Sequence, residues 1–181
     1  MLLDTPICDF GWKGPDFTLQ DPDGHSLTMS EQLGEKGLLI AFICNHCPYV
    51  KAIADRFAQD SKHLMEHGIN VLAIMSNDYN TVPSDSPEKM KAFAARHLFP
   101  FPYLVDEDQS VAKAYDAVCT PDFFGFNHQG ELQYRGRLDD ARMGDATNRT
   151  PELVDAMLLI AKTGNGPQIQ HPSMGCSIKW R

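Results

Sequence analysis

The 181-residue sequence predicts an α/β fold in which a central mixed sheet is flanked by helices. The continuous apolar run 38–43 has the length and composition of a strand buried on both faces of a parallel sheet, and residues 69–75, apolar except for Asn70, predict a second buried strand. The amphipathic stretch 48–67 between them predicts the helical crossover that two parallel strands require. Residues 123–134 carry the pattern of a hairpin, which closes the sheet with an antiparallel edge.

The chain before the first buried strand predicts an N-terminal strand extension. Residues 14–19 begin a short strand. The turn-forming segment 21–24, Asp-Pro-Asp-Gly, leads into a second short strand at 25–28.

The helix expected over 48–67 begins at a residue suited to a first turn. Pro48 lacks a backbone N–H, which costs nothing at that position. Apolar side chains recur at helical spacing as far as Met65 and predict a buried face, whereas charged residues such as Asp60 fall on the other faces.

The second half of the chain predicts further alternation of helices and strands. We expect a helix over 87–97 with Leu98 facing inward, a strand over 101–105, a short helix over 109–115 and a closing helix over 151–163. From residue 164 the chain is rich in Gly, Pro and Gln. We therefore expect one domain over residues 1–163, with residues 164–181 as an extended C-terminal tail packed on it.

The charge balance restricts the partners. The net charge is −8, and an acidic surface repels nucleic-acid phosphates and anionic membranes. No apolar run approaches the roughly 20 residues of a spanning helix. The N-terminal segment lacks the basic and apolar regions of a secretory leader, so we expect a cytoplasmic protein.

Five cysteines are present, and only Cys44 and Cys47 are closely spaced. The odd number and the single close pair fit a reducing compartment with one reactive dithiol better than a disulfide-stapled secreted scaffold. Cys8 lies far from this pair in the sequence and carries no functional prediction.

The dithiol follows a buried strand and opens a helix. Free backbone N–H groups and the positive end of the helix dipole meet there, and both favour a thiolate at Cys44. Cys47 lies three residues on, on the same side of the first turn, within reach of a disulfide. Between them stand Asn45 and His46. A cationic His46 ring would favour the thiolate further and make the disulfide more oxidising.

Two other interpretations of the pair remain open. It could be half of a zinc site, but zinc takes four ligands and only Cys119 and Cys176, brought in by the fold, could complete the set. Both cysteines could instead be buried structural thiols. Their position at a strand–helix junction favours redox chemistry, which requires no cofactor.

Three motifs together resemble one known family. They are residues 14–19, Gly-Pro-Asp-Phe-Thr-Leu; the dithiol after a hydrophobic strand; and residues 120–124, Thr-Pro-Asp-Phe-Phe, before the hairpin. In this order they resemble the alkyl hydroperoxide reductase/thiol-specific antioxidant (AhpC/TSA) branch of the thioredoxin superfamily, over roughly residues 12–162. The resemblance implies a thioredoxin-like fold and a cis peptide bond before Pro121, which would pack against the dithiol. Thr120 would then offer its backbone to a substrate cysteine by strand-like pairing.

The resemblance allows two chemistries, since the branch contains disulfide exchangers and peroxidases. The resemblance to peroxiredoxins implies a Thr-x-x-Cys motif at the start of this helix. In this sequence Cys44 occupies the position of the Thr, and Cys47 with Pro48 matches the peroxidatic Cys-Pro. Thr120 stands where the family's activating Arg lies. We therefore expect a thiol–disulfide oxidoreductase in which Cys44 attacks a disulfide of a protein or small-molecule partner and Cys47 resolves the mixed disulfide.

Two alternatives accompany this prediction. In a peroxidase, Cys47 would be oxidised by a hydroperoxide to a sulfenic acid and would condense with a second thiol. In a non-enzymatic protein the fold would serve as a metal-binding or partner-binding module.

Outside the dithiol, Cys176 is the most interesting thiol. The tail that carries it could fold back onto the dithiol as a resolver or a lid, although pinning of the C-terminus by Ile178 and Trp180 is the simpler interpretation. Cys119 is expected to be a small buried hydrophobe or a third thiol. The charged segment 135–140 is expected to form a surface salt-bridge cluster, with a partner-binding patch as the alternative.

Overall fold

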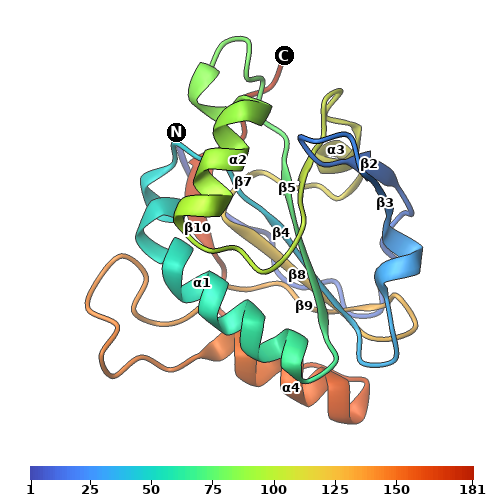
Figure 1. Ribbon diagram of the computed structural model, residues 1–181. Coiled ribbons are helices and arrows are strands. Elements are labelled where there is room, and N and C mark those ends of the chain that lie inside the picture. Colours follow the sequence, from blue (N-terminus) through green and yellow to red (C-terminus); the bar gives the residue numbers. More distant parts are fainter.

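The computed structural model describes residues 1–181, and a seven-stranded mixed sheet forms its centre, in the order β3-β2-β6-β5-β4-β8-β9 (Figure 1). The parallel pairs are β4 with β5 and β5 with β6, whereas β8 and β9 continue the sheet antiparallel. This arrangement confirms the predicted mixed sheet with an antiparallel edge. The strands are β2 (Thr18–Gln20), β3 (Ser26–Thr28), β4 (Leu38–Phe42), β5 (Asn70–Met75), β6 (Tyr103–Val105), β8 (Asp122–Phe126) and β9 (Leu132–Tyr134).

Helices cover both faces of this sheet. They are α1 (Pro48–Glu66), α2 (Pro87–Arg96), α3 (Ser110–Ala114) and α4 (Glu152–Thr163), with short 3₁₀ turns at Met29–Gln32 and Pro83–Asp85. The long helices α1 and α4 lie side by side on one face, and α3 lies behind the sheet in the same view (Figure 1). None of the helices is both long and apolar enough to cross a membrane.

The central strand β4 separates two apolar cores. Leu39 and Ala41 pack with α1, α2 and α4, whereas Leu38, Ile40 and Phe42 pack with α3 on the opposite face. All five side chains are fully buried. Because side chains of a strand alternate between faces, burial on both sides explains why this run is continuously apolar.

A second, three-stranded sheet joins the two ends of the chain. Its order is β1 (Leu2–Asp4), β10 (Met174–Ser177) and β7 (Cys119–Thr120), all antiparallel. The expected extended tail thus contains a strand that was not predicted. The pairing partners of β10 lie more than fifty residues away, so no local pattern in the sequence indicated it.

Some details of the predicted helices were wrong. Met65 is 37% exposed although its neighbour Leu64 is buried. Leu98, which follows the end of α2 in a left-handed backbone conformation, is 82% exposed. Asp60, expected on a solvated face, is buried and pairs with Arg149 at 2.6 Å. An ion pair with a distant loop therefore compensates its burial.

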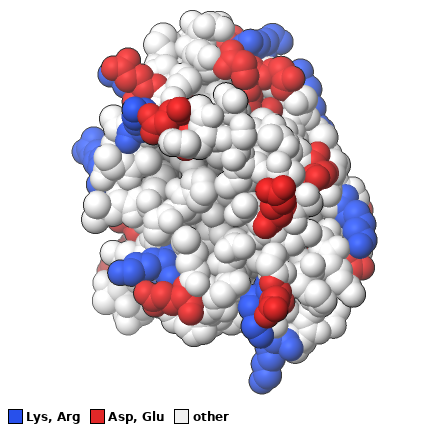
Figure 2. All heavy atoms as spheres, turned by 45° about the vertical axis from the view of Figure 1, so that its right-hand side comes forward, with Lys and Arg blue, Asp and Glu red and all other residues white.

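The expectation of a surface salt-bridge cluster at 135–140 was also wrong. Arg135 is buried and binds Asp122 at 2.8 Å, and the buried Asp139 binds Arg56 at 2.8 Å. These pairs tie the end of the hairpin to β8 and α1. On the face shown in Figure 2, the exposed charges are scattered, and acidic and basic groups are mixed rather than gathered in a patch of one sign.

Candidate active site

The dithiol lies where β4 gives way to α1. Cys47 is the N-cap residue of α1 and Pro48 is its first helical residue. The Cys47 carbonyl accepts hydrogen bonds from the N–H groups of Val50 and Lys51 at 3.1 and 2.9 Å. Both thiols are free and fully buried.

The segment before the hairpin packs against both sulfurs. The Thr120–Pro121 peptide bond is cis, as the family resemblance implied. Sγ of Cys44 lies 3.3 Å from Oγ1 of Thr120, and Sγ of Cys47 lies 3.3 Å from the carbonyl oxygen of Thr120. The structure thus brings Cys44, Cys47, Thr120 and Pro121 together.

The two thiols differ in their electrostatic surroundings. The Cys44 thiol donates a hydrogen bond to Cys47, and this bond, with help from N–H groups of Cys176 and Val50, lowers the pKa of Cys47 despite its burial. The same hydrogen bond, burial and the nearby Asp85 carboxylate raise the pKa of Cys44. These effects favour the thiolate at Cys47 rather than at Cys44, the reverse of the order expected from the sequence. Attack by Cys44 stays a prediction.

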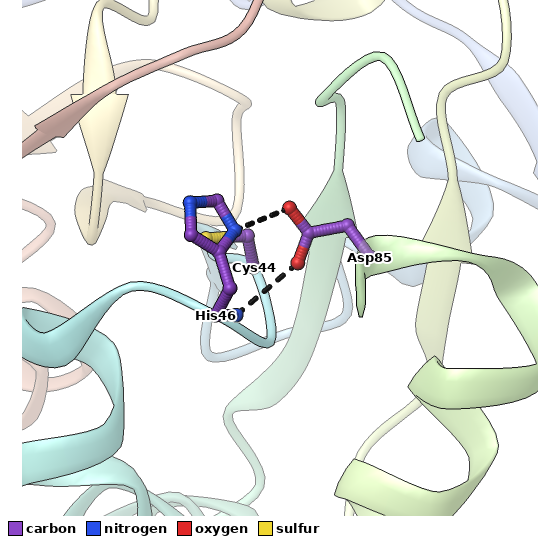
Figure 3. Close-up of side chains that lie close together, drawn as sticks. All are labelled: Cys44, His46 and Asp85. Carbon is purple, nitrogen blue, oxygen red and sulfur yellow. Dashed lines mark hydrogen bonds and ion pairs between the residues drawn. The ribbon is translucent and has the colours of Figure 1, made fainter. Parts of the chain in front are cut away.

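A buried carboxylate explains part of this reversal. Asp85 is fully buried, and its Oδ2 lies 2.6 Å from Nδ1 of His46 (Figure 3). Its Oδ1 accepts the backbone N–H groups of Asn45 and His46 at 2.8 and 3.2 Å. Any positive charge on His46 is thus paired with Asp85, so the ring does not act as the isolated cation expected from the sequence.

Asp85 itself is held in its ionised form. Burial alone would raise the pKa of Asp85, but hydrogen bonds from His46, Asn77 and Asn45 outweigh burial and lower it. Sequence reasoning missed this residue, which lies about forty positions from the dithiol in a polar loop. Asp85 ends the 3₁₀ turn Pro83–Asp85, ten residues after β5, and no local pattern in the sequence indicated it.

Asn45 holds the dithiol turn in place. Its side chain is buried, donates to the carbonyl of Ser84 at 3.1 Å and accepts the hydroxyl of Tyr103 at 2.9 Å. Together with the bonds to Asp85, these contacts tie the turn to the 83–85 segment and to β6. Asn45 therefore positions the turn.

The same turn offers ligands to a metal ion. Ligand atoms of Cys44, His46 and Asp85 lie within 4.8 Å of one another. A thiolate, an imidazole and a carboxylate form a mixed ligand set of the kind that zinc accepts. Three of the four usual ligands are therefore in place.

The C-terminal strand brings a third thiol to the dithiol. In the pairing of β10 with β7, Cys176 lies opposite Thr120. Cys176 packs against the apolar cluster that contains Cys47, and its N–H and thiol help to lower the pKa of Cys47. Ile178 is buried, whereas Trp180 is largely exposed, so the tail is anchored mainly around Cys176 and Ile178.

The remaining cysteines are poor nucleophiles. Burial, assisted by Asp122, raises the pKa of Cys119 to about 12. Burial, assisted by Asp9, raises the pKa of Cys8 to about 11. Cys119 adjoins Thr120 in the chain but fits its expected role as a small buried hydrophobe.

A pocket adjoins the cis-proline. It is lined by Tyr49 and Ile53 of α1, Pro121, Phe123 and Met174, with arginine side chains at its rim. Neither Cys44 nor Cys47 lines this pocket, which adjoins the dithiol only through Pro121 and the first turns of α1.

Comparisons with known proteins identify the family. A model of the AhpC/TSA family matches residues 10–135. Peroxiredoxin Bcp of Escherichia coli (strain K12) is 27% identical over 116 residues, 64% of this chain and 69% of Bcp. Thiol-disulfide oxidoreductase ResA of Bacillus subtilis (strain 168) is 26% identical over 122 residues, 67% of this chain and 64% of ResA.

A solved structure is similar over the whole length. An uncharacterized conserved protein from Geobacillus kaustophilus is 40% identical, with a TM-score of 0.93 over 100% of this chain and 97% of that one. More distant solved disulfide oxidoreductases, below 25% identity, share the fold. Fold and relatives define a thioredoxin-fold thiol oxidoreductase. The chain belongs to the AhpC/TSA family.

Proposed function

We propose that this protein is a thiol–disulfide oxidoreductase whose working group is the Cys44/Cys47 dithiol, with Cys47 as the thiolate. One observation carries the proposal: two free thiols lie at the N-terminus of α1, and both sulfurs lie 3.3 Å from Thr120, the residue before the cis-proline. Two neighbouring thiols, one of them favoured as a thiolate, can form and break a disulfide by exchange.

The reaction follows from the pair. The Cys47 thiolate attacks a partner disulfide, forms a mixed disulfide with one partner sulfur and releases the other as a thiolate. Cys44 then loses its proton and attacks the Cys47 sulfur, which forms the 44–47 disulfide and releases the second partner thiolate. The protein loses two electrons and the partner gains them. In the reverse direction a partner dithiol is oxidised.

The surroundings favour the reverse direction. Interactions that stabilise the Cys47 thiolate stabilise the reduced protein, and they make the 44–47 disulfide a stronger oxidant. Partners would be proteins or small molecules carrying thiols or disulfides, consistent with the exchange activity named for ResA. The cytoplasmic location stays a prediction.

Equilibration with glutathione redox buffers tests this function. Trypsin releases both cysteines in one peptide, residues 37–51, so the 44–47 disulfide is quantified by its mass. We expect a reversible two-electron transition that is absent from Cys44→Ser and Cys47→Ser and unchanged in Cys8→Ser. A dithiol that never forms a 44–47 disulfide over the whole range of buffers would rule the function out.

Hydroperoxide reduction is a second candidate, and one observation favours it. The thiolate is Cys47, followed by Pro48, which is the position that matches the peroxidatic cysteine. Stopped-flow mixing of the reduced protein with hydrogen peroxide distinguishes disulfide exchange from hydroperoxide reduction. A rate near that of a free thiolate supports exchange, whereas a rate at least about a thousandfold higher, lost in Cys47→Ser, identifies a peroxidase.

Metal binding by Cys44, His46 and Asp85 is tested separately. The metal content of the purified reduced protein, measured with and without added zinc, decides whether the three ligands are used. Stoichiometric zinc that blocks alkylation of Cys44 would favour a metal-binding module over redox chemistry.

A further inference from the structure

The strand β10 occupies the edge at which a substrate strand is expected. The family resemblance implies that the residue before the cis-proline pairs its backbone with a bound substrate cysteine. In this protein Thr120 pairs instead with Cys176 of the chain's own C-terminal strand. Cys176 packs against the apolar cluster that contains Cys44 and Cys47, where the cysteine of a bound partner would lie.

The strand is built into this position. Ser173 donates its hydroxyl to the carbonyl of Pro121 at 2.7 Å, and the N–H of Ile178 donates to Val118 at 3.0 Å. The N–H of Lys179 donates to the side chain of Asn77 at 2.8 Å. Hydrogen bonds therefore fix the tail on both sides of Cys176.

A glycine allows this close approach. A Cβ on Gly175 would lie 1.8 Å from the carbonyl oxygen of Thr120, a distance at which the strand would have to move. Glycine is thus required for β10 to lie against the residues before and after the cis bond.

The three thiols are graded in exposure. Cys44 and Cys47 are fully buried, whereas Cys176 is partly exposed. Cys176 packs against the apolar cluster to which the other two belong. With β10 in place, a partner in solution meets the sulfur of Cys176 before it meets either member of the dithiol.

We propose that Cys176 is a third redox thiol, which carries the disulfide between the buried Cys44/Cys47 pair and a partner in solution. The strand β10 then serves as a built-in substrate strand. This inference rests on the proposed dithiol function and adds the route by which a buried dithiol reaches its partner.

The transfer is an exchange with no net oxidation inside the protein. Cys176 loses its proton and attacks the Cys47 sulfur of the 44–47 disulfide. The S47–S176 bond forms as the S44–S47 bond breaks, and Cys44 leaves as a thiolate that takes up a proton. The disulfide has then moved from the core to the partly exposed strand.

The partner completes the reaction. A partner thiolate attacks the sulfur of Cys176, forms a mixed disulfide with it and releases Cys47 as a thiolate. The partner's second thiolate then displaces Cys176, so the partner dithiol loses two electrons and the protein gains them.

Peptide mapping after mild oxidation tests the relay. Trypsin places Cys44 and Cys47 in the peptide 37–51 and Cys176 in the peptide 163–179, so a 47–176 disulfide joins two peptides. Reduced Cys44→Ser, treated with one equivalent of diamide, is expected to give this cross-link within a single chain. Cys8→Ser, which also removes a partly exposed thiol, serves as the matched control and is expected to behave as the wild type.

The rate at which the 44–47 disulfide is reduced provides the second test. The oxidised wild type and oxidised Cys176→Ser are each reduced with dithiothreitol, and the 44–47 disulfide is followed by mass. We expect Cys176→Ser to form the 44–47 disulfide normally and to be reduced at least about tenfold more slowly.

The outcomes separate this inference from the proposed function. Equal reduction rates, or a Cys44→Ser product without the cross-link, would overturn the relay while the 44–47 disulfide of the wild type still supports the function. Absence of the 44–47 disulfide from the wild type would overturn both. A cross-link together with slow reduction of Cys176→Ser supports the relay.

Discussion

Cys176 lies opposite Thr120 in the antiparallel pairing of β10 with β7, and this register places the C-terminal strand beside the cis-proline. The pairing supplies the Cys47 sulfur with a backbone N–H and a thiol from outside the Cys44–Cys47 turn. The acidity of the dithiol and its access to solvent therefore both depend on the C-terminus of the chain.

Replacement of the glycine beside Cys176 tests that dependence. In Gly175→Ala the new Cβ collides with the carbonyl of Thr120, so β10 is displaced and the Cys176 N–H no longer reaches Cys47. We expect alkylation of Cys47 by iodoacetamide to accelerate by about tenfold or more and the unfolding free energy to fall by about 1–3 kcal/mol. Mass spectrometry of the 37–51 peptide follows the alkylation.

Gly144→Ala is the matched control. Its added methyl group would lie in a loop, 3.2 Å from the nearest atom, the carbonyl oxygen of Ala141. It should leave alkylation unchanged. Identical alkylation rates in Gly175→Ala and the wild type would mean that β10 does not shield the dithiol.

The carboxylate behind the dithiol is expected to set the acidity of Cys44. In Asp85→Asn the negative charge that raises the pKa of Cys44 is removed, so the Cys44 thiol should titrate at lower pH. The amide cannot accept all of the hydrogen bonds that converge on Asp85, and we expect a loss of about 1–3 kcal/mol of stability. Thiolate absorbance and denaturant unfolding measure the two effects.

The sign of the pH dependence follows from the lowered pKa of Asp85. The ionised carboxylate stabilises the fold above its unfolded-state pKa, and this contribution is lost as the pH falls through the lowered pKa. In Asp85→Asn this loss of folding stability at acid pH should be absent. Asp106→Asn removes another buried carboxylate that accepts backbone N–H groups, and it should lower stability while leaving the thiols unchanged. A shift of the Cys44 pKa in the Asp106 variant, or none in the Asp85 variant, would contradict this assignment.

The buried ion pair beneath the hairpin predicts a large effect on stability. Arg135 binds Asp122 and the carbonyl of Asp116 and lies over the ring of Phe124. Arg135→Met leaves a buried carboxylate unpaired, which costs about 3–5 kcal/mol of unfolding free energy.

Denaturant unfolding of two further variants tests why Arg135→Met loses unfolding free energy. The double variant Arg135→Met/Asp122→Asn should recover part of it, because no unpaired charge remains. Lys91→Met, which breaks an exposed pair with Asp23, should change stability by less than about 1 kcal/mol. Equal effects of the two single variants would show that burial of the Arg135 pair has no energetic weight.

The features that the sequence predicted are local ones. The apolar runs around Leu39 and Val71 are buried on both faces of the sheet, and the helix after Pro48 follows from its periodicity. The dithiol and the proline before the hairpin were recognisable because each stands at a fixed place in this order of elements.

The features that were missed depend on contacts between distant segments. Asp85 meets His46 across the ends of two strands, and Cys176 meets Cys47 only because β10 pairs with β7. The electrostatic difference between the two thiols has the same origin. The helix terminus favours a thiolate at either cysteine, whereas Asp85 raises the pKa of Cys44 and the N–H of Cys176 helps to lower that of Cys47.

The most direct test of the account is a pH titration of thiolate absorbance in the reduced wild type, Cys44→Ala and Cys47→Ser. Because the pKa of Cys47 is lowered, the wild type should keep one thiolate at neutral pH and lose it only in acid. Cys47→Ser should lose this thiolate, and Cys44→Ala should keep it with a higher pKa, since the thiol donor is gone. A neutral-pH thiolate that survives in Cys47→Ser and disappears in Cys44→Ala would make Cys44 the nucleophile and contradict the account.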